Sequence, residues 1–491
     1  MCTHTIILTM PSTVRILLPV FPLDLREIYF KGYVIISEEY PITIYITKYA
    51  SRDEVLIEKQ QKWDNIIYGY CGNNICNLKI HQFYNFLLLD QNAKLSVNKL
   101  VVNGAQSSAK NNCVIMLYDY YSIRASQTIS DRLDYFSKLQ TLIKGDNREP
   151  ISLEYESDFK SPSWLSSSMF LQHIFNYWKL IYWLVSTIRR DRKISVKHGN
   201  LILAIITDII LGYFLLQLFS QDKKDISTLL MGILEKLINL LYSLLKWLMG
   251  APVGLKLNNA FNKMLGKYFS YHVQLWWLFL DVSSEKLDMI LHIYNYMGYL
   301  GFTFQTAVIA DMICLATFHS YCIYVYAARL FNIQISGLIA LLRLFVGRKY
   351  NPLRGGIDSC EYTNQELFVG TVAFTILLLL LPTTALYYIV FTVFRILSVT
   401  VQYSLAKLIY VVQVFPLYVV TLWLTNSPKV AGNILIEVVN KEENSPLVLR
   451  VKLLSKSIQE LVKTFQPPVV APRQVEWTNL LSNVLVGKQI V

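Results

Sequence analysis

Long apolar segments separated by short polar ones dominate the chain after residue 200. The clearest is Leu367–Phe394, twenty-eight residues without Asp, Glu, Lys, Arg or His. A helix of that length rises about 42 Å at about 1.5 Å per residue, against a bilayer hydrocarbon core of about 30 Å. The other long apolar blocks are Asn200–Phe219, Gly298–Ala327, Ile333–Val346 and Val399–Leu424. The pattern predicts an α-helical polytopic membrane protein with five or six spans.

Other apolar stretches do not read as simple spans. In Ile226–Met249 the polar residues recur three or four positions apart, opposite a broad leucine face: Glu235, Asn239, Ser243 and Lys246. Such an amphipathic helix lies at the membrane interface or packs in a bundle, and the spacing favours neither. The block Tyr268–Leu280 is too short to cross and contains adjacent tryptophans, which is typical of interfacial or re-entrant segments. Pro382 and Pro416 interrupt the last two long blocks, so kinks or breaks are expected there.

The first 160 residues have a different pattern, in which short β-rich runs alternate with polar connections. Tyr33–Thr47 and Asn112–Tyr121 are rich in the Ile, Val and Tyr residues that strands favour. A small α/β or mostly β domain is therefore expected over residues 1–160. A linker and basic juxtamembrane segment then covers 161–199, the membrane domain 200–425, and a polar C-terminal tail 426–491.

Composition and charge support a membrane protein and suggest its orientation. Charged residues make up 16% of the chain and hydrophobic residues 53%, whereas about 25% of an average soluble protein is charged. The net charge is +12, and its Lys and Arg lie close to apolar segments rather than in the dense patch that nucleic-acid binding requires. Five basic residues directly precede the first span and favour a cytosolic N-terminal side: Arg189, Arg190, Arg192, Lys193 and Lys197. The C-terminal tail is also expected in the cytosol.

Two aspartates, Asp208 and Asp311, lie inside otherwise apolar spans. A carboxylate at the bilayer centre costs about 2.5–3.5 kcal/mol, so each should face protein or a wet cavity. One interpretation is a lipid-headgroup or proton site. The other is an interhelical hydrogen bond or ion pair that holds the bundle together, for which three arginines are possible counter-ions: Arg329, Arg343 and Arg395.

His319 stands between Asp311 and Arg329 in a third polar position within an apolar segment. A lone intramembrane histidine fits the base of a polytopic acyltransferase, but it equally fits a histidine bonded to a neighbouring helix or to its own backbone. No D-x-D, G-x-G-x-x-G, Walker, G-x-S-x-G or H-E-x-x-H motif occurs, and no Cys/His pattern completes a zinc site. The sequence therefore predicts no catalytic, cofactor-binding or metal-binding residue.

A basic loop links the apolar block that ends at Val346 to the one that begins at Leu367. It holds four basic residues and no acid before Asp358: Arg343, Arg348, Lys349 and Arg354. Asn351-Pro352 and Gly355-Gly356 predict a turn, since the residue before proline resists helix and glycine admits positive φ. Each basic residue contributes about 1 kcal/mol near an anionic leaflet. The loop is a candidate contact for an acidic headgroup or an acidic partner surface, or it only orients the spans.

Three long strings carry a resemblance to a known family. They are Trp247–Trp276, Phe318–Phe331 (FHSYCIYVYAARLF) and Leu341–Phe391, which begins LLRLFVGRKYNPLRGGID. Over about Asn200 to Leu424 the chain resembles the PIG-Q family, the Q subunit of the phosphatidylinositol N-acetylglucosaminyltransferase complex.

The resemblance implies a place in the first step of glycosylphosphatidylinositol (GPI) anchor synthesis. There N-acetylglucosamine passes from UDP-GlcNAc to phosphatidylinositol on the cytosolic face of the endoplasmic reticulum. It also implies that a PIG-A-type subunit performs the transfer, while this one assembles and stabilises the complex with PIG-C- and PIG-H-type subunits. Two other functions stay open: a membrane-embedded lipid-modifying enzyme that uses Asp311 and His319, and a lipid transporter or scramblase that uses Asp208 and Asp311.

Overall fold

The structure, a computed structural model, separates into two compact units. One comprises Met1–Glu156, Ile194–Asn200 and Pro416–Gln466, and the other Ser157–Lys193, Leu201–Phe415 and Pro467–Val491. The residues that the structure describes are 14–20, 27–36, 42–51, 65–72, 84–90, 95–107, 113–129, 135–145, 165, 167–220, 223–250, 252–254, 257–284, 286–440, 446–472, 482–484 and 486–489. Most of the expected linker before Ser168 falls outside them.

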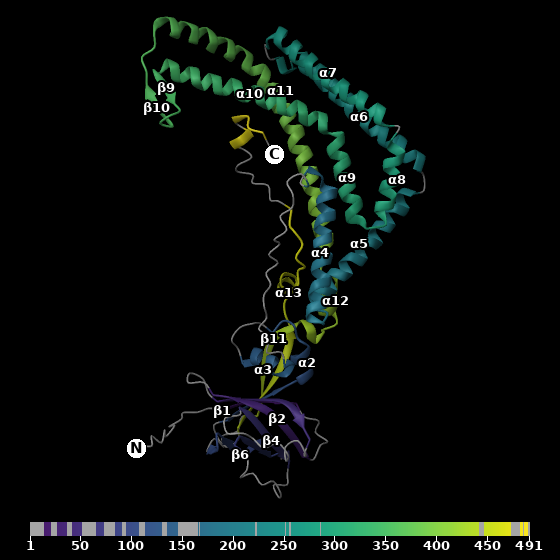
Figure 1. Cartoon of the computed structure of the whole chain (residues 1–491), viewed down its shortest axis with the longest axis vertical. Coiled ribbons are helices and arrows are strands. Elements are labelled where there is room, and N and C mark those ends of the chain that lie inside the picture. Colours follow the sequence, from purple (N-terminus) through teal and green to yellow (C-terminus); the bar gives the residue numbers. More distant parts are fainter. Residues whose placement is uncertain are drawn as a thin grey trace. The chain divides into compact units, whose positions relative to one another are not determined.

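The first unit is built on a ten-stranded mixed sheet, in the order β11-β12-β8-β1-β3-β2-β4-β5-β6-β7 (Figure 1). The β-rich N-terminal region expected from the sequence is thus confirmed, although β2 and β3 replace the single run expected at Tyr33–Thr47. The strands are β1 (Val14–Pro19), β2 (Glu27–Ile35), β3 (Thr43–Ala50), β4 (Ile66–Gly72), β5 (Phe86–Asp90), β6 (Ser96–Val102), β7 (Ala105–Ser107), β8 (Cys113–Tyr118), β11 (Ala431–Asn440) and β12 (Leu447–Ser455).

The central strands of this sheet are buried on both faces. On β1, Ile16 belongs to one hydrophobic cluster and Leu17 to another, because successive side chains point to opposite faces. Helices α2 (Tyr120–Ala125) and α3 (Tyr135–Lys144) supply side chains to the second cluster. Strands with two buried faces are long apolar runs rather than alternating ones, which is why this region looks apolar in sequence.

Strands β11 and β12 come from the part of the chain that follows the membrane helices. β12 pairs in parallel with β8, with Leu447 opposite Val114 and Val451 opposite Tyr118. A short helix, α13 (Ile458–Thr464), then packs with α12 (Leu417–Leu424) around Leu461 and Val419. The segment that the sequence sets apart as a tail therefore completes the N-terminal sheet.

The second unit is helical. Its helices are α4 (Met169–Asp191), α5 (Val196–Ser220, which starts in the first unit), α6 (Lys223–Met249), α7 (Asn259–Ser284), α8 (Leu287–Gly298), α9 (Phe302–Ala316), α10 (Phe318–Phe345) and α11 (Asn364–Val414). Leucine and aromatic side chains from α6, α7, α10 and α11 form its main core, for example Leu245, Phe269, Tyr324 and Phe391. Between α10 and α11 lies a small hairpin of β9 (Arg348–Asn351) and β10 (Gly356–Ser359), visible in Figure 1.

Four helices in the described part of the chain are long and apolar enough to cross a membrane. They comprise Val196–Gln217, Thr228–Met249, Phe318–Phe345 and Asn364–Val414. A shorter apolar helix, α9, has fifteen residues. The broad prediction of a helical membrane protein is confirmed, while the expected five or six spans exceed these four helices.

The boundaries of the helices differ from the apolar blocks in two places. The block Gly298–Ala327 is divided at Thr317, whose hydroxyl donates to the Ile313 carbonyl at 2.8 Å where α9 ends. The last two blocks join in one helix of 51 residues, which continues through Pro382 and ends before Pro416. A hydropathy pattern averages over many residues, so it misses a one-residue break and cannot separate a tolerated proline from one that ends a helix.

Candidate functional site

Asp208 on α5 binds the first turn of α9. Its Oδ1 accepts the backbone N–H of Thr303 at 2.9 Å, and its Oδ2 accepts the Thr303 hydroxyl at 2.7 Å. The Asp208 side chain is 4% exposed and Thr303 is fully buried. Helix N-termini leave N–H groups without an intrahelical partner and attract negative charge. Asp208 therefore caps α9 from a neighbouring helix.

A third helix joins this contact through His173 on α4. Its Nε2 lies 3.1 Å from the Thr303 hydroxyl oxygen, and its ring packs edge-on against Phe304. The single hydroxyl proton of Thr303 goes to Asp208, so the hydroxyl oxygen accepts from His173 Nε2–H, which assigns the tautomer from the network. Three helices thus meet at one buried threonine.

Glycines allow α5 to approach the turn between α8 and α9. Gly301 has φ +145, and a Cβ there would lie 2.3 Å from Asp208 Oδ2. A Cβ on Gly212 would lie 2.6 Å from the Gly301 carbonyl carbon. The fully buried Gln305 closes the contact, since its amide nitrogen donates to the carbonyls of Gly212 at 2.8 Å and Gly298 at 3.1 Å.

Asp311, on α9, makes the same kind of contact with the start of α4. It accepts three hydrogen bonds there: from the Ser168 hydroxyl at 2.5 Å, the Met169 N–H at 2.8 Å and the Phe170 N–H at 3.1 Å. Ser168 is itself the N-cap of α4, since its hydroxyl oxygen accepts the Leu171 N–H. Both aspartates are therefore helix caps supplied by a neighbouring helix.

The geometry shows that hydrogen bonds, rather than ion pairs with arginine, compensate the charges of the two aspartates. In the described residues both carboxylates are held by hydroxyl and amide donors, and the arginines offered as counter-ions do not bind them. Arg395 instead lies over the Tyr321 ring, 4.6 Å from its centroid. Amide and hydroxyl donors at a helix start compensate a carboxylate without a second buried charge.

The structure does not bring His319 to Asp311. His319 is buried on α10 and stacks near Trp276 of α7, with ring centroids 6.1 Å apart. Neither ring nitrogen has a hydrogen-bond partner of standard geometry among the described residues. Asp311 and His319 thus face different helices, and they do not form the acid–base pair that the enzyme interpretation needs.

The four basic residues of the loop lie on two different elements, the end of α10 and the β9–β10 hairpin. Arg343 lies in the last turn of α10, where a positive charge suits the helix C-terminus. Arg348 and Lys349 lie on β9, and Arg354 lies in the turn that follows, all three exposed to solvent. The loop is thus a hairpin rather than the plain turn expected, although the turn at Pro352 and the two glycines is confirmed.

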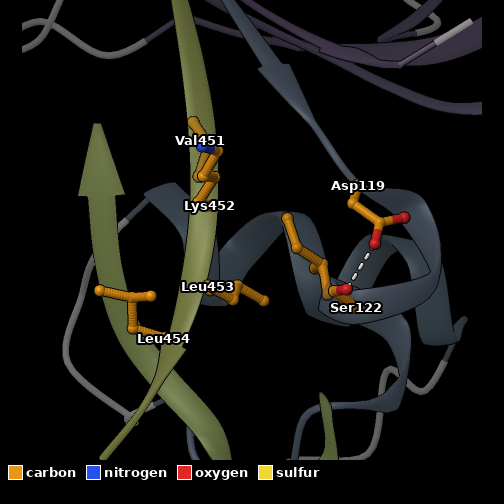
Figure 2. A pocket seen from close by; sticks show the side chains of 7 residues that line it. Asp119, Ser122, Val451, Lys452, Leu453 and Leu454 are labelled. Atoms are coloured by element: carbon orange, nitrogen blue, oxygen red, sulfur yellow. Dashed lines mark hydrogen bonds between the residues drawn. The ribbon is translucent and has the colours of Figure 1, made fainter. Parts of the chain in front are cut away.

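The described residues offer little else for ligand chemistry. A hollow of about 250 Å³ lies beside β12, and the side chains that line it include Asp119, Ser122 and Lys452 (Figure 2). Asp119 accepts the N–H of Tyr121 and the hydroxyl of Ser122, and Lys452 pairs with Glu437 at 2.8 Å, so these polar groups are already bound. Among the described residues no three His, Cys, Asp or Glu side chains gather where they could hold a metal ion.

The sequence marks both aspartates but not the residues that form the contact around Asp208. Thr303, Gln305 and His173 are ordinary polar positions in sequence, and their partners lie on other helices. A usable signal was Ser168, which directly precedes an apolar aromatic run in the way an N-cap does. Gly298 and Gly301, just before an apolar run, were a second signal of a close backbone approach.

Comparisons with known proteins agree with one another. Residues 170–432 match the Gpi1 family, described as N-acetylglucosaminyl transferase component. Phosphatidylinositol N-acetylglucosaminyltransferase subunit Q from Mus musculus is 36% identical over 299 residues, 60% of this chain and 51% of the relative. Its Homo sapiens counterpart is 40% identical over 257 residues, 52% of this chain and 33% of the relative.

A more distant relative extends the match. The N-acetylglucosaminyl-phosphatidylinositol biosynthetic protein gpi1 of Schizosaccharomyces pombe is 26% identical over 350 residues, 68% of this chain and 53% of the relative. The chain thus spans about half, or less, of the length of these curated relatives. No solved structure matches it. The matched region contains Asp208, Asp311, α9, α4 from its second residue on, and the basic hairpin.

Proposed function

Because the chain belongs to the Gpi1 family, we propose that it is a membrane subunit of the complex that transfers N-acetylglucosamine from UDP-GlcNAc to phosphatidylinositol, the first step of GPI-anchor synthesis. The relatives are named as subunits or components of that transferase or as a protein of that biosynthesis. Its proposed partners are the catalytic PIG-A-type subunit, the PIG-C- and PIG-H-type subunits, and phosphatidylinositol in the membrane.

Within that complex the proposed role is assembly rather than catalysis. The observation that carries it is the use of two carboxylates, the buried Asp208 and the half-buried Asp311, as caps for helices α9 and α4. A carboxylate that accepts two or three hydrogen bonds from its own fold serves the fold, because carrying a proton or an ion would weaken the contacts that hold α9 and α4. The absence of a sugar-nucleotide motif from the sequence points the same way.

Location and topology are part of the proposal. We place the protein in the endoplasmic reticulum membrane, with the sheet-containing N-terminal domain in the cytosol, because five basic residues precede the apolar part of α5 that begins at Asn200. Five or six crossings need more than the four long apolar helices. The fifteen-residue helix α9 is one source. The 51 residues of α11 rise about 76 Å, more than one crossing needs, but a continuous helix that does not reverse its direction counts as one crossing.

The basic residues Arg343, Arg348, Lys349 and Arg354 are proposed to contact an acidic headgroup or an acidic partner surface. Their exposure on the hairpin supports this for the last three. The two rival functions have less support. A lipid-modifying enzyme lacks the Asp311–His319 pair, and a transporter that uses Asp208 would first have to break the cap on α9.

Depletion of the protein tests the assembly role. We expect the amount of intact transferase complex to fall, while the complex that remains keeps its KM for UDP-GlcNAc, because the donor site belongs to another subunit. Co-purification of the other subunits measures the amount, and a transfer assay on the purified remainder measures KM. If the purified chain alone transferred N-acetylglucosamine to phosphatidylinositol, the proposal would be wrong.

A further inference from the structure

The β9–β10 hairpin is fixed by its own hydrogen bonds. At its base the Cys360 N–H donates to the Gly347 carbonyl at 2.9 Å. Near its tip the Asn351 amide donates to Asp358 at 2.8 Å, and the Asn351 side-chain oxygen accepts the Leu353 N–H at 3.0 Å. The backbone of the hairpin is therefore held by hydrogen bonds of its own at both ends.

Strand register gives this hairpin two different faces. Arg348 pairs with Ser359, Lys349 with Asp358, and Tyr350 with Ile357. Since side chains alternate along a strand and paired residues share a face, one face carries four residues that we call the apolar–basic face: Arg348, Tyr350, Ile357 and Ser359. The opposite face carries Lys349 and the only carboxylate in the hairpin, Asp358.

The two faces differ in their electrostatic surroundings as well. The charge of Lys349 acts on the Glu366 carboxylate, which the Thr363 N–H and hydroxyl hold at the start of α11. Arg348 has no carboxylate on its face. The four basic residues that the sequence groups together are thus not equivalent, because Lys349 has the Asp358 carboxylate opposite it on its own face and Arg348 has none.

The tip and the apolar–basic face are unusually exposed for apolar residues. Leu353 is 96% exposed, Tyr350 53% and Ile357 51%. Arg354 directly follows Leu353 and is exposed too. Aliphatic and aromatic side chains next to arginine are typical of segments at a membrane interface, where the apolar parts enter the lipid and the charges stay at the headgroups.

The position of the hairpin in the chain places it next to the membrane. It joins α10 to α11, and both helices are long and apolar enough to cross a bilayer. We propose that the apolar–basic face and the tip dock on an anionic phospholipid surface, with Leu353 inserted at the interface and Arg348 and Arg354 on lipid phosphates. The inference rests on the proposed function only in that it takes α10 and α11 to lie in the membrane.

Amide hydrogen exchange of the full chain in lipid nanodiscs tests the docking. Exchange in peptides that cover Arg348–Ser359 is compared between phosphatidylcholine discs and discs that also contain phosphatidylserine or phosphatidylinositol. We expect about tenfold slower exchange with either anionic lipid, since each basic residue is attracted to an anionic surface. The difference should shrink as salt is added, because exposed charges are screened over about 8 Å at physiological ionic strength.

Matched variants assign the effect to one face. Replacing Arg348 and Arg354 together (Arg348→Gln, Arg354→Gln) should abolish the dependence on anionic lipid, whereas Lys349→Gln on the opposite face should preserve it. Leu353→Ser should speed exchange of the tip in all discs. An equal loss in Lys349→Gln, or equal exchange of the unaltered chain in both lipids, would overturn the proposal. So would protection that appears only when other subunits are bound, because the occupant would then be a protein.

The proposed function is measured separately in the same variants. The yield of assembled transferase complex should stay unchanged in Arg348→Gln with Arg354→Gln, because the caps and the helical core are untouched. Full complex yield in cells that lack the protein would refute the assembly role and leave the lipid comparison standing. If exchange were the same in all lipids while complex yield still fell in cells that lack the protein, the docking proposal would be refuted and the assembly role would stand.

Discussion

Asp311 holds the start of α4 through three donors that lose their partner together. Asp311→Leu leaves the Ser168 hydroxyl and the N–H groups of Met169 and Phe170 without an acceptor. A fully buried unsatisfied donor costs about 1–3 kcal/mol and a half-buried one costs less, so we expect the three together to lower thermal stability in detergent. Asp311→Asn should lose less, because its one remaining oxygen still accepts the two bonds made by Oδ2 while its amide faces the Met169 N–H.

Thermal unfolding of the purified variants checks this order. The matched control is Glu235→Gln on α6, where an exposed carboxylate is neutralised and little change is expected. An Asp311→Asn protein that assembles fully into the complex, yet leaves that complex inactive, would point to a chemical role for the carboxylate.

Gly301 is a second residue at which one added atom should matter. A Cβ there would lie 2.3 Å from Asp208 Oδ2 at a φ of +145, so Gly301→Ala strains the backbone and displaces the cap on α9. We expect it to destabilise the protein by about 1–3 kcal/mol. Gly232→Ala on α6 meets nothing within 4 Å and should stabilise by about 0.5–1 kcal/mol, since alanine favours helix. Equal melting temperatures for the two variants would contradict the close approach.

At the scale of elements, the strands β11 and β12 make the N-terminal domain depend on a distant part of the chain. Val448 and Val451 are buried against the sheet, and β12 covers the edge of β8. A fragment of residues 1–156 should therefore aggregate, since β8 would present a bare apolar edge. The same fragment fused through a flexible linker to residues 416–466 should be soluble and unfold cooperatively. Circular dichroism and size-exclusion chromatography compare the two.

The sequence predicts elements better than it predicts their partners. Residue types located the β-rich run at Asn112–Tyr121 and the basic turn at Pro352, since both signals are local. They could not show that Leu447 lies opposite Val114, more than three hundred residues earlier, nor that Asp208 meets Thr303. Such pairings depend on which surfaces meet once the helices and strands have formed. The polar positions were therefore predictable, and the caps that they form were not.

At the scale of the whole molecule, the composition of the sheet limits how the chain can be threaded through a bilayer. Strand β8 precedes the membrane helices and β12 follows them, yet the two are hydrogen-bonded neighbours. We expect N-glycosylation acceptor sites, inserted in exposed positions beside β8 and beside β12, to show the same modification state in microsomes. Opposite states would mean that the pairing of β12 with β8 does not form in the membrane-inserted protein.

The pairing of β8 with β12 also determines whether the number of membrane crossings is even or odd. A sheet cannot be divided by a lipid bilayer, so a chain that leaves the sheet after β8 and returns to it at β11 must pass through the membrane an even number of times. With five passes, β11 and β12 would lie on the opposite side of the membrane from β8. Of the two span counts proposed, five and six, only six therefore allows the sheet to form. Insertion of a single additional span should, by the same logic, leave the N-terminal domain unable to fold although every one of its own residues is intact.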